Sequence, residues 1–184
     1  IEEGRRHIRW DEKWSSYRNQ TGPVRKGVGM AIFCYKTGVH PISLETASAR
    51  MILNQDGSMQ LQMGATEIGQ GADTVFTQMA AEVTGITEDK VNVLSTQDTD
   101  VSPFDTGAYA SRQTYVSGMA VKKTGAIFKE KILDYAAYML EKPQDTLDVR
   151  DNHIVDKETG TQLLPMEELA TTAFYSLDRS VHIT

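Results

Sequence analysis

The sequence lacks several features that define whole classes of protein. It has a single cysteine, Cys34, so it cannot form an internal disulfide, and we expect a protein of a reducing compartment, the cytoplasm. No segment approaches the roughly 20 apolar residues of a membrane span, and the charged start at Ile1–Arg6 has no apolar signal core. The 19 Lys and Arg residues form no run and are outnumbered by 25 Asp and Glu, which argues against nucleic-acid binding.

Common catalytic and metal-binding patterns are also missing. The four histidines have no ligand spacing, and Cys34 lies in an apolar run, where we expect it to be buried and inert. Asp98, Asp100 and Asp105 do not match the spacing of an EF-hand loop, so they are better explained as turn formers. No Gly-x-Ser-x-Gly motif is present. The sequence therefore offers hydrogen-bond donors but no acid/base machinery, and we expect no metal ligands.

The pattern of apolar residues predicts an α+β fold with mixed strands and hairpins packed against two main helices. Asp56-Gly57 indicates a tight turn between strands 47–53 and 59–63, of which the second has one buried and one solvated face. Further strands are predicted over 27–35 (buried), 91–94, 147–149 and 153–155, and helices over 5–19, 72–84 (ended by Gly85), 111–140 and 166–174.

We expect one domain over residues 1–184, with a leading helical part (1–26), a core (27–141) and a C-terminal strand pair and helix (142–184). The aromatic stripe of the first helix is expected to pack in a core. Gly118 and Gly125 are expected to allow close packing of the long helix. Residues 181–184 resemble the start of a strand, which suggests a domain of a longer polypeptide. The predicted apolar seam of the long helix is Val116, Met119, Ala126, Leu133, Ala137 and Leu140.

A glycine-rich segment, Gly64–Thr74, joins a predicted strand to a predicted helix. Gly69 and Gly71 let the backbone approach a ligand. The helix start offers unpaired amides that suit an anion. Gly64 and Gly69 have the interval of a P-loop, but Gln70-Gly71 stands where that motif requires Lys and then Ser or Thr, which argues against a phosphotransferase. The pattern alone favours an ordinary glycine-rich turn between a strand and a helix, because short glycine motifs are weak signals.

A long polar loop, from Gln97 to about Ala110, precedes a second helix start. Loops of this length are uncommon in compact domains unless they have a function. We expect Ser111 to cap the helix and Arg112 to present a forked donor suited to phosphate or to the edge of a planar ring. A simple Ser cap with a solvated Arg112 fits the same residues.

Two such helix starts in one small domain lead to a hypothesis. If the two helix starts converge, they form a binding site for an elongated ligand that carries phosphate. If they point in opposite directions, the hypothesis is rejected. A free-standing module that binds a nucleotide-like anion without chemistry is the alternative.

Four segments, in register and in this order, resemble the molybdenum hydroxylase family, which includes xanthine dehydrogenases and aldehyde oxidases. The resemblance covers roughly residues 8–140. The segments are Gly27-Val28-Gly29-Met30-Ala31, Asp56-Gly57-Ser58, Gly64-Ala65-Thr66-Glu67-Ile68-Gly69-Gln70-Gly71-Ala72-Asp73-Thr74 and Ala110-Ser111-Arg112-Gln113-Thr114.

The resemblance implies part of a two-subdomain region that binds molybdopterin with molybdenum, in bacteria as the cytosine dinucleotide form. It implies oxidation of a purine such as xanthine or hypoxanthine, a related N-heterocycle or an aldehyde, with water as the oxygen source. Electrons then pass to 2Fe-2S centres and FAD on other domains or subunits, and the acidic loop 97–109 is similar to the purine-oxidising branch. The cofactor-binding residues implied are Gly69, Gln70, Gly71, Ala72, Asp73, Ala110, Ser111, Arg112, Gln113 and Thr114.

The resemblance also implies what this chain does not supply. The family's catalytic glutamate, its upstream Gly-Gly-Phe-Gly-type segment and its iron–sulfur cysteines have no counterpart in the sequence. We therefore expect no catalytic residue here, and we expect the chain to act with the rest of a molybdenum subunit, iron–sulfur and FAD partners and a small-molecule substrate. By itself it should be inactive.

Overall fold

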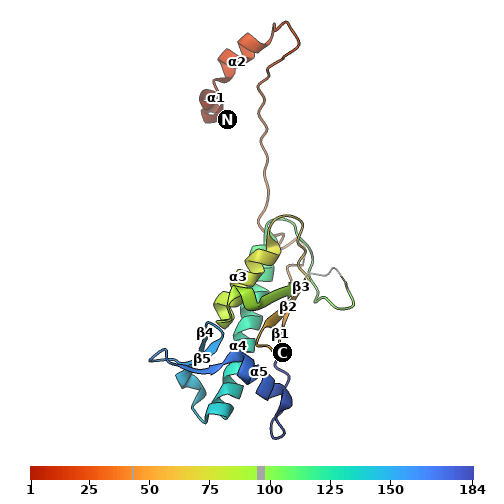
Figure 1. Cartoon of the computed structure of the whole chain (residues 1–184). Helices are drawn as coiled ribbons and strands as arrows, with labels where there is room; N and C mark the ends of the chain where they lie inside the picture. Colours follow the sequence, from red (N-terminus) through yellow and green to blue (C-terminus); the bar gives the residue numbers. More distant parts are fainter. Residues whose placement is uncertain (43, 95–97) are drawn as a thin grey trace. The chain divides into compact units, whose positions relative to one another are not determined.

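The computed structural model describes residues 1–42, 44–94 and 98–184, which divide into two compact units, Ile1–Tyr35 and Lys36–Thr184 (Figure 1). The start of the polar loop at Gln97 lies outside the described residues. None of the described helices combines the length and the apolar character needed to cross a membrane.

The first unit contains two short helices, α1 (Glu2–His7) and α2 (Trp10–Tyr17), in place of the single helix predicted over 5–19. The helix is interrupted at Arg9, whose φ of 54° is left-handed. The rings of Trp10 and Trp14 stack at 5.6 Å, and Trp14 is 51% exposed. The prediction that these aromatic residues pack in a core is therefore wrong, because neither α1 nor α2 contains a buried residue.

Residues 27–35 do not form the buried strand that the sequence predicts. They have no regular secondary structure, and apart from the half-buried Val28 all of them are exposed, Phe33 at 89%. Cys34 is exposed as well, contrary to expectation. An apolar run favours burial, but a buried strand also needs a neighbouring strand to pair its backbone. No described strand supplies that pairing, so the prediction of a buried strand is wrong.

The second unit contains a three-stranded sheet in the order β1 (Ala49–Leu53), β2 (Met59–Met63), β3 (Val91–Leu94). The predicted hairpin is confirmed, since β1 and β2 pair antiparallel around the Asp56-Gly57 turn, while β3 lies parallel to β2. The alternation in β2 is only partly as predicted: Gln62, on the face expected to be solvated, is buried at 8% and accepts a hydrogen bond from the Arg50 Nε at 2.7 Å.

Two helices cover this sheet. α3 (Ala72–Thr84) ends at Gly85 in a left-handed conformation, as predicted, and packs against α4 (Gly118–Leu140). A Cβ on Gly118 would lie 2.8 Å from the Met79 sulfur, and a Cβ on Gly125 would lie 2.7 Å from a Val83 methyl. Both glycines therefore allow the close approach of the helices that the sequence predicts.

The buried face of α4 differs from the predicted seam. Of the predicted seam residues, Met119 and Ala126 are exposed, and Val116, Leu133, Ala137 and Leu140 are only half-buried. The predicted seam follows a helical phase next to the buried one, so it left out Val121, Phe128 and Ile132. The buried residues are Gly118, Val121, Gly125, Phe128, Ile132, Tyr135 and Ala136.

A second sheet completes the unit, in the order β4 (Leu147–Arg150), β5 (His153–Asp156), β6 (Gln162–Pro165). The pair β4–β5 and the helix α5 (Met166–Tyr175) were predicted, whereas β6 was not. The Ile183 carbonyl accepts a hydrogen bond from the Leu53 amide at 3.0 Å, so the chain end lies beside the edge strand β1. Short 3₁₀ turns occur at Glu88–Lys90 and Gln144–Thr146. The fold is α+β, as expected.

Candidate functional site

The glycine-rich turn is tightly packed at Gly64, where it leaves β2, and faces open space at Gly69 and Gly71. A Cβ on Gly64 would collide with the Pro103 carbonyl, so glycine is required where the turn meets the polar loop. Gly69 and Gly71 have φ values of 97° and 84°, which favour glycine, and a Cβ on either would meet no described atom within 4 Å. This part of the turn faces open space.

The amides at the start of α3 are not free, as the sequence analysis expected them to be. The Glu67 carboxylate accepts hydrogen bonds from the amides of Gly69 at 2.6 Å, Gly71 at 3.1 Å and Asp73 at 3.2 Å. The Gly71 amide contributes most to lowering the pKa of Glu67; partial burial opposes the shift, and the other amides add to it. The prediction of unpaired amides is therefore wrong, and another anion could bind there only by displacing Glu67.

The two predicted segments nevertheless come together through their side chains. The Gln70 carboxamide nitrogen donates to the Gln113 carboxamide oxygen and, at 2.8 Å, to the Thr66 carbonyl. Gln113 donates in turn to the same Thr66 carbonyl at 2.9 Å. The hypothesis that the segments converge is thus supported, since the turn before α3 and the helix start before α4 share one hydrogen-bond cluster.

The second helix start is irregular. Ala110 and Ser111 both have left-handed backbones, with φ values of 47° and 50°, a conformation that costs non-glycine residues free energy. They lead into a π-helical turn, Gln113–Ser117, which continues as α4. Ser111 is exposed and precedes the helix, and no side-chain cap is recorded at this start among the described residues, so the predicted Ser111 cap is wrong. Strained backbone and π-turns are frequent at functional sites.

The Arg112 guanidinium points inward instead of presenting a free fork to a ligand, so that prediction is wrong. Its side chain is fully buried, with Nη1 at 2.5 Å from Asp105 and 2.8 Å from the Gly107 carbonyl. Nε donates to Glu45 at 3.0 Å, and Nη2 donates to the Thr46 carbonyl at 2.6 Å. Arg112 therefore ties the polar loop and residues 45–46 to the start of α4.

Charges in this buried cluster stabilise one another. Burial acts against the charged form of Arg112, but its hydrogen bonds to Asp105 and Glu45 outweigh burial and raise its pKa. The pKa of Glu45 is lowered, mainly by the Val39 amide and then by Arg112. The Asp105 carboxylate, also fully buried, accepts from the Ser117 hydroxyl at 2.7 Å with one oxygen and from Arg112 with the other, so both oxygens are engaged within the fold.

The remaining predicted residues differ in exposure. Gly69, Gln70, Ser111 and Thr114 are exposed, Gly71 and Asp73 are half-buried, and Ala72, Ala110 and Gln113 are buried. An apolar hollow of about 510 Å³ begins at Ser111 and Thr114 and continues between α3 and α4 past Met79 and Met119. The surface that a ligand can reach thus includes neutral polar groups beside a largely apolar wall, and the charged side chains of Glu82 and Lys122 also line the hollow.

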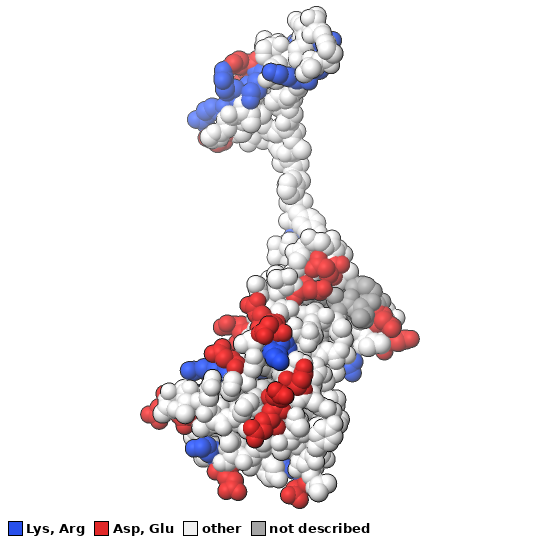
Figure 2. Space-filling view, viewed as in Figure 1, with Lys and Arg blue, Asp and Glu red and all other residues white. Residues whose placement is uncertain are grey.

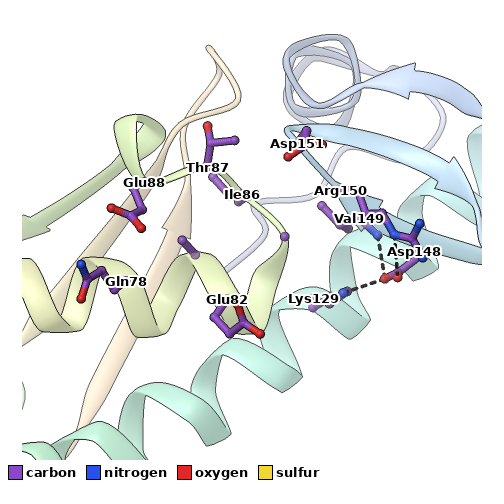
Figure 3. Close-up of a pocket in the computed structure, with 12 residues that line it drawn as sticks. Gln78, Glu82, Ile86, Thr87, Glu88, Lys129, Asp148, Val149, Arg150 and Asp151 are labelled. Atoms are coloured by element: carbon purple, nitrogen blue, oxygen red, sulfur yellow. Dashed lines mark hydrogen bonds and ion pairs between the residues drawn. The ribbon is translucent and has the colours of Figure 1, made fainter. Parts of the chain in front are cut away.

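A second hollow, of about 540 Å³, lies where the end of α3 faces β4 (Figure 3). The two basic side chains that line it, Lys129 and Arg150, both face Asp148, at 2.6 Å and 3.8 Å. Because these cations are already paired with a carboxylate of the chain, the hollow is a poor anion site.

Charge on the surface agrees with the composition. Figure 2 shows acidic side chains scattered over the visible face of the unit Lys36–Thr184, with Lys and Arg between them and no continuous basic area on that face. This face is not of the kind that binds nucleic acid.

The comparisons with known proteins define the family. The family model of the molybdopterin cofactor-binding domain matches residues 3–184. The chain therefore belongs to the molybdopterin cofactor-binding domain family, and the expected relationship to molybdenum hydroxylases is confirmed.

Among its relatives is the xanthine dehydrogenase molybdenum-binding subunit of Escherichia coli O157:H7, 46% identical over 180 residues, a match that covers 97% of this chain and 24% of the relative. The carbon monoxide dehydrogenase large chain of Afipia carboxidovorans is 27% identical over 183 residues, a match that covers 94% of this chain and 22% of the relative. The solved Cu,Mo-CO dehydrogenase structure matches with a TM-score of 0.67 at 26% identity over 81% of this chain and 19% of that one. The chain thus spans about a fifth to a quarter of the length of these relatives.

Sequence reasoning missed Glu67. The available signal was an acidic residue two positions before Gly69, within reach of the amides of a helix start, a position where carboxylates are favoured. The buried position of Arg112 depends on Asp105, seven residues away, and on Glu45, 67 residues away, and no sequence pattern links Arg112 to either carboxylate.

Proposed function

We propose that this chain is the molybdopterin-binding part of a larger molybdenum-dependent oxidoreductase. One observation carries the proposal: Gln70 and Gln113, from the two segments that resemble the family's cofactor motifs, are hydrogen-bonded to each other. Family membership over residues 3–184 supports it.

The residues present fit a pterin in their chemistry. A carboxamide is both donor and acceptor, which suits the ring edge of a pterin, where donors and acceptors alternate. Because the Gln70 nitrogen already donates to Thr66 and Gln113, the pterin in this proposal bonds to the Gln70 oxygen or replaces one of these two bonds. Gln70 lies between two glycines whose Cβ positions face open space, so a flat ligand can approach the backbone. In this proposal Gln70, Gln113, Ser111 and Thr114 hold the polar edge, and the other predicted residues, including Arg112, support them from within. The molybdenum centre would supply oxidation of a substrate carbon with oxygen from water.

The finer assignments rest on the resemblance and on the relatives. We propose the cytosine dinucleotide form of molybdopterin, a purine or related N-heterocycle or aldehyde as substrate, and 2Fe-2S centres and FAD on other domains or subunits in the cytoplasm. The remainder of a molybdenum subunit is the proposed partner of residues 27–35, because exposed apolar side chains such as Phe33 favour burial.

In this proposal, other parts of the enzyme carry out catalysis. Glu67 and Glu45 are engaged with backbone amides and with Arg112. Neither is available as a general base in this arrangement, so the proposed role of the chain is to bind and orient the cofactor. We predict no hydroxylase activity for residues 1–184 alone.

Metal and pterin analysis of the protein as its gene encodes it tests the proposal. We expect near-equimolar molybdenum and a fluorescent pterin oxidation product in the wild type, and a loss of about tenfold or more in Gln70→Ala, which removes three hydrogen bonds at the site. Gln78→Ala, an exposed glutamine of α3, is the matched control and should retain molybdenum. Equal molybdenum in all three proteins would reject the site.

The anion-binding module without chemistry is less well supported. Its main feature would be the free start of α3, and Glu67 already fills that position. Tight binding of a nucleotide by a protein that never contains molybdenum would restore this alternative.

A further inference from the structure

The Glu67 carboxylate lies inside the turn that carries Gln70. One of its oxygens, Oε1, accepts from the amides of Gly69 and Gly71, and the other, Oε2, accepts from Asp73. Three amides of one turn thus converge on a single carboxylate, an arrangement that proteins use to hold anions. Here the anion is a side chain of the same turn.

The constraint supplied by Glu67 is one that the turn otherwise lacks. Glycine populates many backbone conformations, so a turn with glycine on both sides of Gln70 has little intrinsic preference for one shape. The amides bound by Glu67 are those of the residues directly before and after Gln70. Fixing both neighbours fixes the backbone from which the Gln70 side chain starts.

The Gln70 side chain is held in one orientation as a result. Its Oε1 accepts from the Ile68 amide at 2.6 Å, while its Nε2 donates to Thr66 and to Gln113. These bonds form only if the turn folds back on itself, because Ile68 and Thr66 precede Gln70 by two and four residues. Glu67 therefore contacts the backbone on both sides of Gln70, and the Gln70 side chain contacts Gln113.

We propose that Glu67 is a positioning residue of the cofactor site: its carboxylate holds the Gly69–Gly71 turn so that the Gln70 carboxamide meets Gln113. This inference rests on the proposed function for its biological meaning. The coupling from Glu67 to Gln113 is a property of the chain itself and can be tested without cofactor.

The first test is NMR spectroscopy of the full chain without cofactor, comparing wild type, Glu67→Ala, Glu67→Gln and the control Glu82→Gln on the exposed face of α3. We expect amide exchange at Gly69 and Gly71 to accelerate about tenfold or more in Glu67→Ala, as bonds to a charged acceptor are lost. The side-chain amide resonances of Gln70 and Gln113 should move as well. Glu67→Gln, which keeps one acceptor oxygen, should fall between, and Glu82→Gln should match the wild type. Unchanged Gln113 resonances in a folded Glu67→Ala chain would overturn the inference.

The second test is a double-mutant cycle on molybdenum retention in the protein as its gene encodes it. If Glu67 acts through Gln70, Glu67→Ala lowers retention about tenfold in the wild-type background and has little further effect beside Gln70→Ala. Equal losses in both backgrounds would show that Glu67 acts by another route and would contradict the inference. A wild-type protein that contains no molybdenum would refute the proposed function, and the NMR comparison would still decide the role of Glu67.

Discussion

Replacing Arg112 is the perturbation whose consequence follows most directly from the structure. The Arg112 and Asp105 side chains are both fully buried and lie 2.5 Å apart. Removing one member of a buried ion pair costs about 3–5 kcal/mol, because the other charge stays buried without its partner. Arg112→Ala also removes donors to the Thr46 and Gly107 carbonyls. We expect a loss of about 4 kcal/mol, within that range.

Arg112→Lys separates charge from geometry. A lysine keeps the positive charge but has three donors on one nitrogen, whereas Arg112 serves four acceptors that lie in different directions. At least one bond to a buried group is lost, so we expect a loss of about 2 kcal/mol. The order of stability should be wild type, then Arg112→Lys, then Arg112→Ala.

The assay is urea unfolding of the full chain followed by circular dichroism. Arg150→Ala is the matched control, because Arg150 is half-exposed and lies 3.8 Å from Asp148, so its loss should stay below about 1 kcal/mol. If Arg112→Ala also loses less than about 1 kcal/mol with an unchanged dependence on urea, the buried cluster does not have the role assigned to it.

Three further predictions follow. Gly85→Ala should destabilise the chain by about 2 kcal/mol or more in the same assay, since Gly85 has a φ of 82° and a Cβ would collide with the Val149 carbonyl; a neutral effect would contradict the packing of α3 on β4. Because the pKa of Glu67 is lowered in the folded chain, its carboxylate stabilises the fold above the unfolded pKa of about 4.3, and this stabilisation is lost as pH falls through the lower folded pKa. As pH is lowered, the urea midpoint should therefore fall less steeply in Glu67→Gln than in the wild type. Identical pH profiles would count against the role of the carboxylate. In residues 1–184 alone, folded Cys34 should react with a thiol reagent about as fast as in the unfolded chain, and strong protection there would show that it is covered within this chain.

Local sequence patterns predicted most elements of the second unit. The Asp56-Gly57 hairpin, the helix that ends at Gly85 and the helix after Pro165 each depend on residues close together in the chain, and each was found. Periodicity did not predict what covers an apolar run. It therefore placed residues 27–35 in a buried strand and assigned the wrong face of α4 to the core.

The candidate site was predictable in its location and not in its chemistry. Motif resemblance selected the turn at Gln70 and the helix start at Gln113, which the structure brings together. The directions of the Arg112 and Glu67 side chains depend on partners that a pattern does not reveal. Arg112 is drawn inward by Asp105 and by the distant Glu45, and Glu67 satisfies the amides that the sequence analysis expected to be free.

The central claim is that the Gln70 turn and the Gln113 helix start together bind the pterin. An experimental structure of the protein purified with its molybdenum tests this claim most directly. We predict pterin atoms within hydrogen-bond distance of the Gln70 carboxamide, with Gln113 beside it. Pterin density elsewhere in the protein, with the Gln70 turn facing solvent, would contradict it.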